Sequence, residues 1–271
     1  MSSRDILFAP APPADERVAY GDEPQQFGDL RLPRLSKGQE PYPVVMAIHG
    51  GFWRAEFDLV YMGHLCEALR AAGVATWNVE YRRVGEPGGA WPGTFEDVAR
   101  AADHLRALAP RHDLDLTRVV TLGHSAGGHL ALWLAACPRI PADGPLYAPA
   151  PLPMKAAVSL AGVVDLHEAY RQDLGDGAMR ELMGGGPDEY PARYAAASPA
   201  ALLPLGVPQA LVHGTADDRV PYALSRDYHA LAIARGDDTR LITLPDADHF
   251  TLVTPDTPES ATVLDTTLAL L

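Results

Sequence analysis

Short apolar runs alternate along the chain with longer stretches whose apolar residues recur every three or four positions. The run 43–48 is wholly apolar and rich in β-branched residues, which is typical of a strand buried on both faces of a parallel sheet. Further strands are predicted over 74–81, 118–122, 156–164, 209–213 and 240–244. Helices are predicted over 59–72, 94–108, 126–136, 222–234 and 258–271. This alternation predicts an α/β fold, with a mostly parallel sheet and helices on both faces.

Four segments lie outside this alternation of predicted strands and helices. Residues 1–20 are rich in Pro, Ala and charge, and we expect a loose N-terminal arm there. Residues 27–32 alternate weakly and predict an edge strand, while the Pro-rich stretch 138–153 predicts a long surface loop. Residues 166–203 separate two strands and predict a small cap of short helices over the strand ends. Residues 1–271 are expected to form a single domain.

One helix start carries a recognisable capping pattern. Thr94 precedes the apolar periodicity of the helix over 94–108, and Asp97 follows it by three residues. A hydroxyl and a carboxylate at this spacing predict Thr94 as the N-cap of a capping box.

Charge and cysteine content narrow the range of partners. The 271 residues include 35 acidic and 22 basic ones, a formal net charge of -13, so nucleic acid and anionic membranes are poor partners. The negative charge is expected mainly to keep the protein soluble, with at most a mild preference for neutral or cationic substrates. Cys66 and Cys137 do not make a disulfide framework and are expected to be small core residues. Neither a secretory signal nor a stretch long enough to span a bilayer is apparent, so the cytoplasm is the expected compartment.

The segment 123–128 carries the pattern G-x-S-x-G between a predicted strand and a predicted helix. This context is that of a nucleophile elbow, a strained turn that presents a serine hydroxyl at a helix N-terminus. Gly123 and Gly127 would remove side chains that otherwise clash across the turn. Ser125 is therefore the candidate nucleophile.

A serine hydroxyl needs a base, and the base needs a carboxylate to fix its tautomer. His249 follows the last predicted strand, and Asp217, with Asp218 as the less favoured alternative, follows the strand before it. Loops after parallel strands gather at one edge of a sheet, so these residues are expected to meet Ser125. The order Ser125, Asp217, His249 is that of α/β-hydrolases and not of chymotrypsin or subtilisin. Because no second His or Cys stands at ligand spacing from His249, no metal site is predicted.

Glycines after the first buried strand suggest an oxyanion hole. Gly50 and Gly51 allow a close approach of the backbone, and the N–H of Gly51 or Phe52 is expected to act with the N–H of Ala126. His49 and His213 are expected to brace their loops through backbone hydrogen bonds. The aromatic residues near predicted strand ends are candidates for the walls of a substrate pocket: Trp53, Trp91 and Phe250.

Together these motifs resemble the α/β-hydrolase superfamily, and within it the branch of small-molecule esterases and arylformamidases (kynurenine formamidase-like enzymes). The resemblance is carried by segments 49–53, 123–128, 213–217 and 248–249, with support from 20–33 and 79–83, and it extends from about residue 20 to the end. It implies an eight-stranded, mostly parallel sheet and neither a metal nor an organic cofactor. Hormone-sensitive-lipase-like esterases carry a third glycine where this chain has Phe52, whereas arylformamidases are similar to this chain in placing an aromatic residue there.

The sequence thus predicts a serine hydrolase that cleaves a small-molecule ester or an aryl formamide through an acyl-enzyme. An N-formylkynurenine formamidase proper is one alternative. A binding protein that keeps the hydrolase fold without catalysis is an alternative of another class. The oligomeric state stays open, a homodimer included.

Overall fold

The computed structural model describes residues 3–34 and 41–271. Within these residues, eight strands form one sheet in the order β1-β2-β4-β3-β5-β6-β7-β8. The strands are β1 (Glu16–Ala19), β2 (Phe27–Arg31), β3 (Tyr42–Ile48), β4 (Ala75–Val79), β5 (Leu114–His124), β6 (Ala156–Leu160), β7 (Gln209–Gly214) and β8 (Thr239–Leu244). Strands β3 to β8 pair in parallel, while β2 pairs antiparallel with both β1 and β4. The predicted mostly parallel eight-stranded sheet is confirmed. The edge strand predicted over 27–32 is second from the edge, because β1 covers it.

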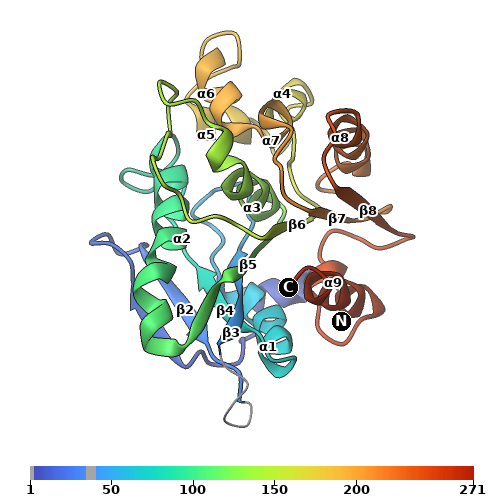
Figure 1. The fold of residues 1–271 in the computed structure, drawn as a ribbon. Helices are drawn as coiled ribbons and strands as arrows, with labels where there is room; N and C mark the ends of the chain where they lie inside the picture. Colours follow the sequence, from blue (N-terminus) through green and yellow to red (C-terminus); the bar gives the residue numbers. More distant parts are fainter. Residues whose placement is uncertain (1–2, 35–40) are drawn as a thin grey trace.

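Helices cover both faces of the sheet (Figure 1). On one face lie α2 (Gly93–His112), α3 (Ala126–Ala136) and α8 (Tyr222–Ala234), and on the other lie α1 (Gly63–Ala71) and α9 (Pro258–Leu268). Strand β3 shows why its sequence is apolar throughout: Val44, Met46 and Ile48 belong to one core cluster and Val45 and Ala47 to the other, all fully buried. Both faces of this strand are interior, so a polar residue at any of these positions would lose its water without a partner.

Helix α2 starts differently from the sequence prediction. Its N-cap residue is Pro92, and Thr94 lies inside the first turn, where its hydroxyl donates to the carbonyl oxygen of Arg82 at 2.6 Å. The Asp97 carboxylate is fully buried and pairs with the Arg82 guanidinium at 2.7 Å. The capping box predicted at Thr94 is therefore wrong, because Asp97 is held by a long-range ion pair instead of by the helix start.

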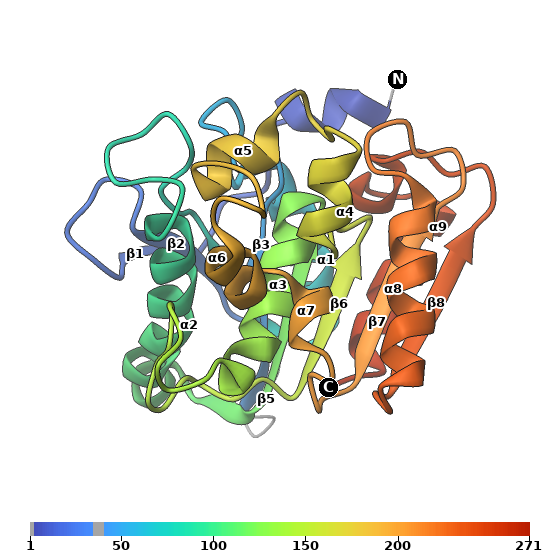
Figure 2. The ribbon, with the colours of Figure 1, turned by 90° about the horizontal axis from the view of Figure 1, so that it is seen from above.

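The segment 166–203 consists of four short helices: α4 (Leu166–Arg171), α5 (Ala178–Met183), α6 (Pro191–Ala197) and α7 (Pro199–Leu202). Figure 2 shows α4 and α5 near the carboxyl ends of the strands, whereas α6 and α7 lie alongside α3. Two side chains of α3 fix α6 there, His129 donating to the Ala197 carbonyl and Trp133 to the Ala196 carbonyl. Only the first half of the predicted cap thus lies over the strand ends.

The N-terminal arm is ordered from its first described residue. Ser3–Phe8 forms a short 3-10 helix, η1, in which Ile6 is buried, and the Ser3 hydroxyl donates to the Asp248 carboxylate at 2.6 Å. Figure 2 shows η1 at the same end of the molecule as α4 and α5. The prediction of a loose arm over 1–20 is wrong for these residues, because η1 docks beside residue 248 and β1 joins the sheet.

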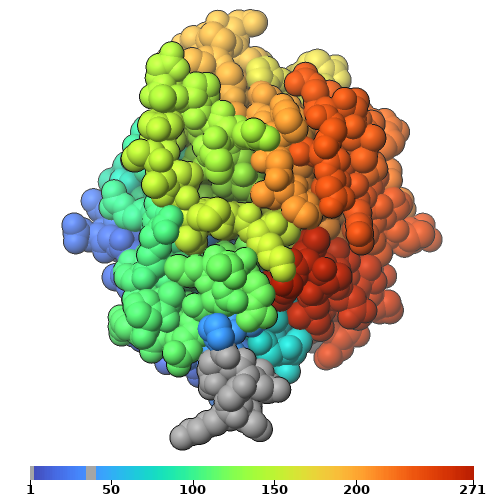
Figure 3. All heavy atoms as spheres, viewed as in Figure 1, coloured from blue at the N-terminus to red at the C-terminus, as the bar shows by residue number. Residues whose placement is uncertain are grey.

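The loop after α3 lies on the outer surface, where the space-filling view shows it in yellow-green (Figure 3). Its backbone is held to α2, since the N–H of Leu152 donates to the Asp103 carboxylate at 2.9 Å. In the described parts of the chain, no helix combines the length and the apolar character that crossing a membrane requires.

Candidate active site

Ser125 lies in the sharp turn between β5 and α3. Its φ of 59° and ψ of -120° are strained for a residue with a side chain. A Cβ on Gly123 would lie 2.0 Å from the carbonyl oxygen of Gly127, so the turn closes only with glycine at position 123. The steric reason predicted for this glycine is confirmed, and the sequence forces the Ser125 side chain to the carboxyl edge of the sheet.

The loop after β3 lies directly against this turn. A Cβ on Gly50 would lie 2.8 Å from the Ser125 Cβ, and the Gly50 N–H donates to the Tyr61 hydroxyl at 2.6 Å. Gly50 therefore allows the loop to lie close to Ser125, but its own N–H is already bonded to Tyr61 and is not available to an oxyanion. The next two residues, Gly51 and Phe52, have φ values of 108° and 51° and line the same cavity as Ser125. Their N–H groups and that of Ala126, the buried first residue of α3, are the candidate donors to an oxyanion.

His249 and Asp217 meet after β8 and β7. The distance from His249 Nδ1 to Asp217 Oδ2 is 2.7 Å. The other oxygen of Asp217 accepts the backbone N–H groups of Arg219 and Val220, both at 2.8 Å. Burial alone would raise the pKa of the Asp217 carboxyl, but hydrogen bonds from His213 and His249 hold that pKa well below its usual range. Asp217 therefore stays ionised beside the histidine. Asp218 points to solvent instead, with its side chain 70% exposed.

His213 supports the loop that carries Asp217. Its Nε2 lies 2.9 Å from the carbonyl oxygen of Val220 and 3.2 Å from Asp217 Oδ2, while its Nδ1 lies 2.7 Å from the Ser225 hydroxyl. Because Nε2 faces two acceptors, it carries the proton, and Nδ1 accepts from Ser225. The bracing of this loop through a backbone hydrogen bond is confirmed, but the contact with the carboxylate of Asp217 could not be predicted.

Tyr61 and His124 join the three loops by one chain of hydrogen bonds. The Tyr61 hydroxyl lies 3.0 Å from His124 Nδ1, and His124 Nε2 lies 2.9 Å from the carbonyl oxygen of His249. Burial lowers the pKa of His124 to about 3, so its ring is neutral. Since Nε2 must donate to the carbonyl, Nδ1 accepts from Tyr61, whose hydroxyl in turn accepts from Gly50. The loops of Gly50, Ser125 and His249 are thereby held in fixed positions relative to one another. The sequence did not reveal this role of Tyr61, because Tyr61 resembles an ordinary aromatic residue of the core.

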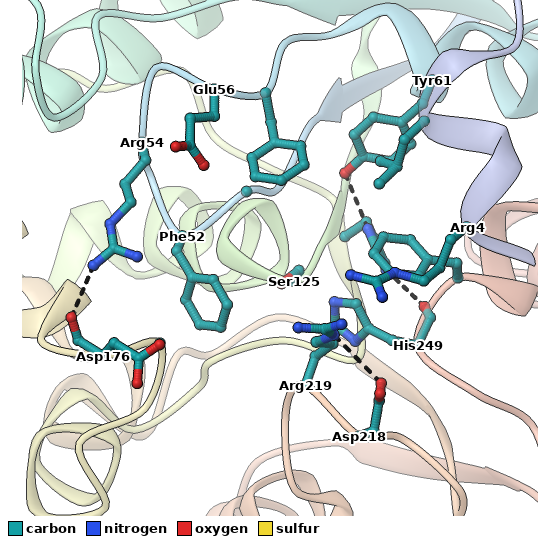
Figure 4. A pocket seen from close by; sticks show the side chains of 16 residues that line it. Arg4, Phe52, Arg54, Glu56, Tyr61, Ser125, Asp176, Asp218, Arg219 and His249 are labelled. Carbon is teal, nitrogen blue, oxygen red and sulfur yellow. Dashed lines mark hydrogen bonds and ion pairs between the residues drawn. The ribbon is translucent and has the colours of Figure 1, made fainter.

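Ser125 and His249 line one cavity of about 340 Å³, shown in Figure 4. Phe52 and Phe250 line it as well, together with Arg4 and Leu7 of the N-terminal helix. Among the described residues, no group of three or more His, Cys, Asp or Glu side chains is arranged to hold a metal ion.

Two aromatic residues expected in the pocket lie elsewhere. Trp53 is fully buried with its ring edge-on to His129 of α3, and Trp91 packs edge-on against Phe95 of α2. Phe52 and Trp53 are consecutive residues in a turn with left-handed backbone, so their side chains diverge and only Phe52 lines the cavity. The assignment of Trp53 and Trp91 to the pocket walls is corrected accordingly.

Comparison with known proteins finds a matching family model and similar chains that include esterases. The family model described as BD-FAE matches residues 29–231. The esterase LipQ of Mycobacterium tuberculosis is 29% identical over 227 residues, which cover 81% of this chain and 52% of LipQ. The chain thus spans about half the length of this curated relative.

Solved structures of similar fold cover the chain more completely. A truncated carbohydrate esterase from gut microbiota superimposes with a TM-score of 0.80 at 22% identity, covering 95% of this chain and 98% of that one. The apo form of Thermogutta terrifontis esterase 2 gives a TM-score of 0.77 at 23% identity, covering 95% and 93% of the two chains. These similarities establish the α/β-hydrolase fold.

Proposed function

The chain belongs to the BD-FAE family, and from this premise we propose that it is a serine hydrolase cleaving small carboxylic esters. Ser125 is the nucleophile, His249 the general base and Asp217 the acid that orients it. The observation that carries the proposal is the 2.7 Å hydrogen bond between His249 Nδ1 and Asp217, with His249 and Ser125 on the wall of one cavity. This bond leaves Nε2 of His249 as the nitrogen able to accept a proton.

The reaction proceeds in two acyl transfers. Ser125 Oγ attacks the ester carbonyl while His249 takes the hydroxyl proton, and the N–H groups of Gly51 or Phe52 and of Ala126 hold the oxyanion. His249 then protonates the departing alcohol, leaving an acyl group on Ser125. Water attacks this acyl-enzyme with the same proton transfers, releasing the carboxylic acid and restoring the hydroxyl.

Phe52 limits the length of the acyl group. It follows Gly51 in the loop of the candidate oxyanion donors, and a Cβ on Gly175 between α4 and α5 would meet the Phe52 ring at 2.6 Å. The ring thus packs against the cap at Gly175, which restricts its movement away from the cavity. We therefore assign short acyl groups, acetyl to butyryl, to this enzyme.

A series of aryl esters tests this assignment. We expect kcat/KM to fall beyond butyryl when the acyl chain is lengthened from acetyl to decanoyl. In Phe52→Ala the optimum moves to longer chains, since each methylene that finds room gains up to about 0.8 kcal/mol. A wild-type optimum at octanoyl or longer would refute the short-acyl assignment.

The same assay separates an esterase from a formamidase. A formamidase is also compatible with Phe52, because arylformamidases are similar to this chain in having an aromatic residue at this position. N-formylkynurenine is assayed beside the aryl acetates. A kcat/KM well above that for the acetates assigns the formamidase activity, and no detectable turnover assigns a carboxylesterase.

Tyr61 is proposed to position the three loops, and its replacement by phenylalanine tests this. Tyr61→Phe leaves the buried Gly50 N–H and His124 Nδ1 without partners, which costs about 1–3 kcal/mol of stability. Because the loops are then no longer fixed relative to one another, the reacting groups are less well aligned. We therefore expect kcat to fall about tenfold or more with a smaller change in KM.

The matched control is Tyr228→Phe, which removes another buried tyrosine hydroxyl, one that donates to Gln209 at 2.7 Å. Gln209 begins β7, at the far end from the loop of Asp217. This variant is expected to lose stability without a comparable loss of kcat. Equal kcat values for the two variants would show that Tyr61 has only a structural role.

A further inference from the structure

The charges of the cavity differ from those of the protein as a whole. The net charge is -13, yet the cavity is lined by three arginines and three carboxylates. Figure 4 shows these charges in two groups: Arg54, Glu56 and Asp176 lie near Phe52, and Arg4, Arg219 and Asp218 lie near His249. The overall charge is therefore a poor guide to the substrate.

On the Phe52 side, the arginine is paired with groups of the protein. Arg54 Nε donates to Glu181 at 2.7 Å, and its guanidinium also donates to the carbonyl oxygen of Asp176 at 3.0 Å. Glu56 and Asp176 are exposed there. On this side the charge of Arg54 is balanced by Glu181, and two further carboxylates face a ligand.

On the His249 side, Arg219 has a donor to spare. Its Nε is buried and has no hydrogen-bond acceptor among the described residues, while the nearest carboxylate oxygen, Asp218 Oδ1, forms only a 3.5 Å ion pair. That partner is weak because the Asp218 side chain is 70% exposed to water. A buried donor without an acceptor is costly in a folded protein. The Arg219 side chain lines the cavity (Figure 4), where its guanidinium group is placed to meet a ligand.

Arg4 reaches the same side from the opposite end of the sequence. Its guanidinium carbon lies 6.0 Å from the centre of the Phe250 ring, next to His249. The helix η1 that carries it is held by the hydrogen bond from Ser3 to Asp248 and by the buried Ile6. The packing of η1 against the rest of the protein thus places Arg4 at the cavity wall.

The position of these arginines relative to His249 decides which part of a substrate they meet. The general base must reach the leaving oxygen to protonate it, so the leaving group occupies the His249 side. We propose that Arg219 and Arg4 form a subsite for an anionic group, above all a carboxylate, on the alcohol portion of the ester. This inference rests on the proposed ester hydrolysis. The planar fork of donors on arginine matches the two oxygens of a carboxylate.

Isosteric esters test the subsite. The substrates are 3- and 4-acetoxybenzoate, compared with the matching acetoxybenzamides, in which an uncharged amide replaces the carboxylate. We expect the wild-type protein to prefer the anionic ester by about tenfold in kcat/KM, mainly through KM, as a charged hydrogen bond of this kind predicts. The preference shrinks as salt is raised from about 0.02 M to about 0.5 M, because the subsite is partly open to solvent.

Substitutions assign the preference to residues. Arg219→Gln and Arg4→Gln should each reduce the ratio of the two kcat/KM values, and the double variant should bring it close to one. Asp218→Asn should raise it, because a competing carboxylate is lost. Arg226→Gln is the matched control: this arginine on α8 is 60% exposed, pairs with Asp227 and does not line the cavity, so the ratio should stay at the wild-type value.

Binding of the alcohol products separates this inference from the proposed function. Calorimetry with 4-hydroxybenzoate and 4-hydroxybenzamide should show tighter binding of the anion, lost in Arg219→Gln. If neither ester is hydrolysed but the anion still binds through Arg219, ester hydrolysis is refuted and the subsite stands. If the esters are hydrolysed at equal rates and both products bind equally, or if Arg219→Gln keeps the preference, the subsite is refuted and the hydrolase stands.

Discussion

Replacing Ser125 by alanine is expected to lower kcat for aryl acetates by about six orders of magnitude, the loss seen when the nucleophile of a comparable triad is removed. The hydroxyl is the atom to which the acyl group is transferred, and no other serine lines the cavity among the described residues. The fold should persist, because the substitution leaves in place Gly123, which the turn requires. Steady-state kinetics and the free energy of unfolding measured by denaturant check both expectations.

Ser159→Ala is the control for this variant. Ser159 lies on β6, fully buried, and its hydroxyl has no partner among the described residues. Its loss should change kcat by less than about threefold, within the range of a substitution outside the reacting groups. A fluorophosphonate probe should attach to residue 125 in the wild type and in Ser159→Ala only. Activity above a few per cent in pure Ser125→Ala would rule out the nucleophile role, and no labelling of the wild type would favour the non-catalytic binding protein.

The parts of the site that follow from local sequence could be predicted. The turn around Ser125 needs glycine at position 123 whatever surrounds it, so its pattern is visible in the chain. Asp217 and His249 follow successive parallel strands, whose carboxyl ends must share one edge of the sheet. Chain order and strand position together therefore indicated which loops would meet.

The parts of the site that depend on contacts between residues far apart in the chain could not be predicted from the sequence. Arg4 enters the cavity because Ser3 meets Asp248, a contact across 245 positions that no periodicity encodes. Tyr61 lies in an apolar stretch of sequence, and its role in hydrogen bonding depends on which groups the folded chain places beside its hydroxyl. Asp97 stands at capping spacing from Thr94, yet a buried ion pair with Arg82 outweighs a local hydrogen bond.

The second large effect concerns the acid beside His249. Asp217→Asn is expected to lower kcat by about four orders of magnitude, as the loss of the orienting carboxylate does in a comparable triad. The two backbone N–H groups of Arg219 and Val220 require an oxygen at the Oδ1 position, so the new amide nitrogen must face His249. That nitrogen donates to Nδ1 and forces the ring proton onto Nε2. Nε2 then cannot accept the proton of Ser125, and the charge that stabilised the imidazolium is lost as well.

Asp218→Asn separates this effect from a general change of charge in the loop. Asp218 is the adjacent residue and lies mostly in water, so its replacement should lower kcat for a neutral aryl acetate by less than about tenfold. Equal unfolding free energies for the two variants would show that the difference lies in the chemistry. If Asp218→Asn instead caused the larger loss of kcat, the acid would have to be reassigned to Asp218, and the 2.7 Å contact between Asp217 and His249 would be structural only.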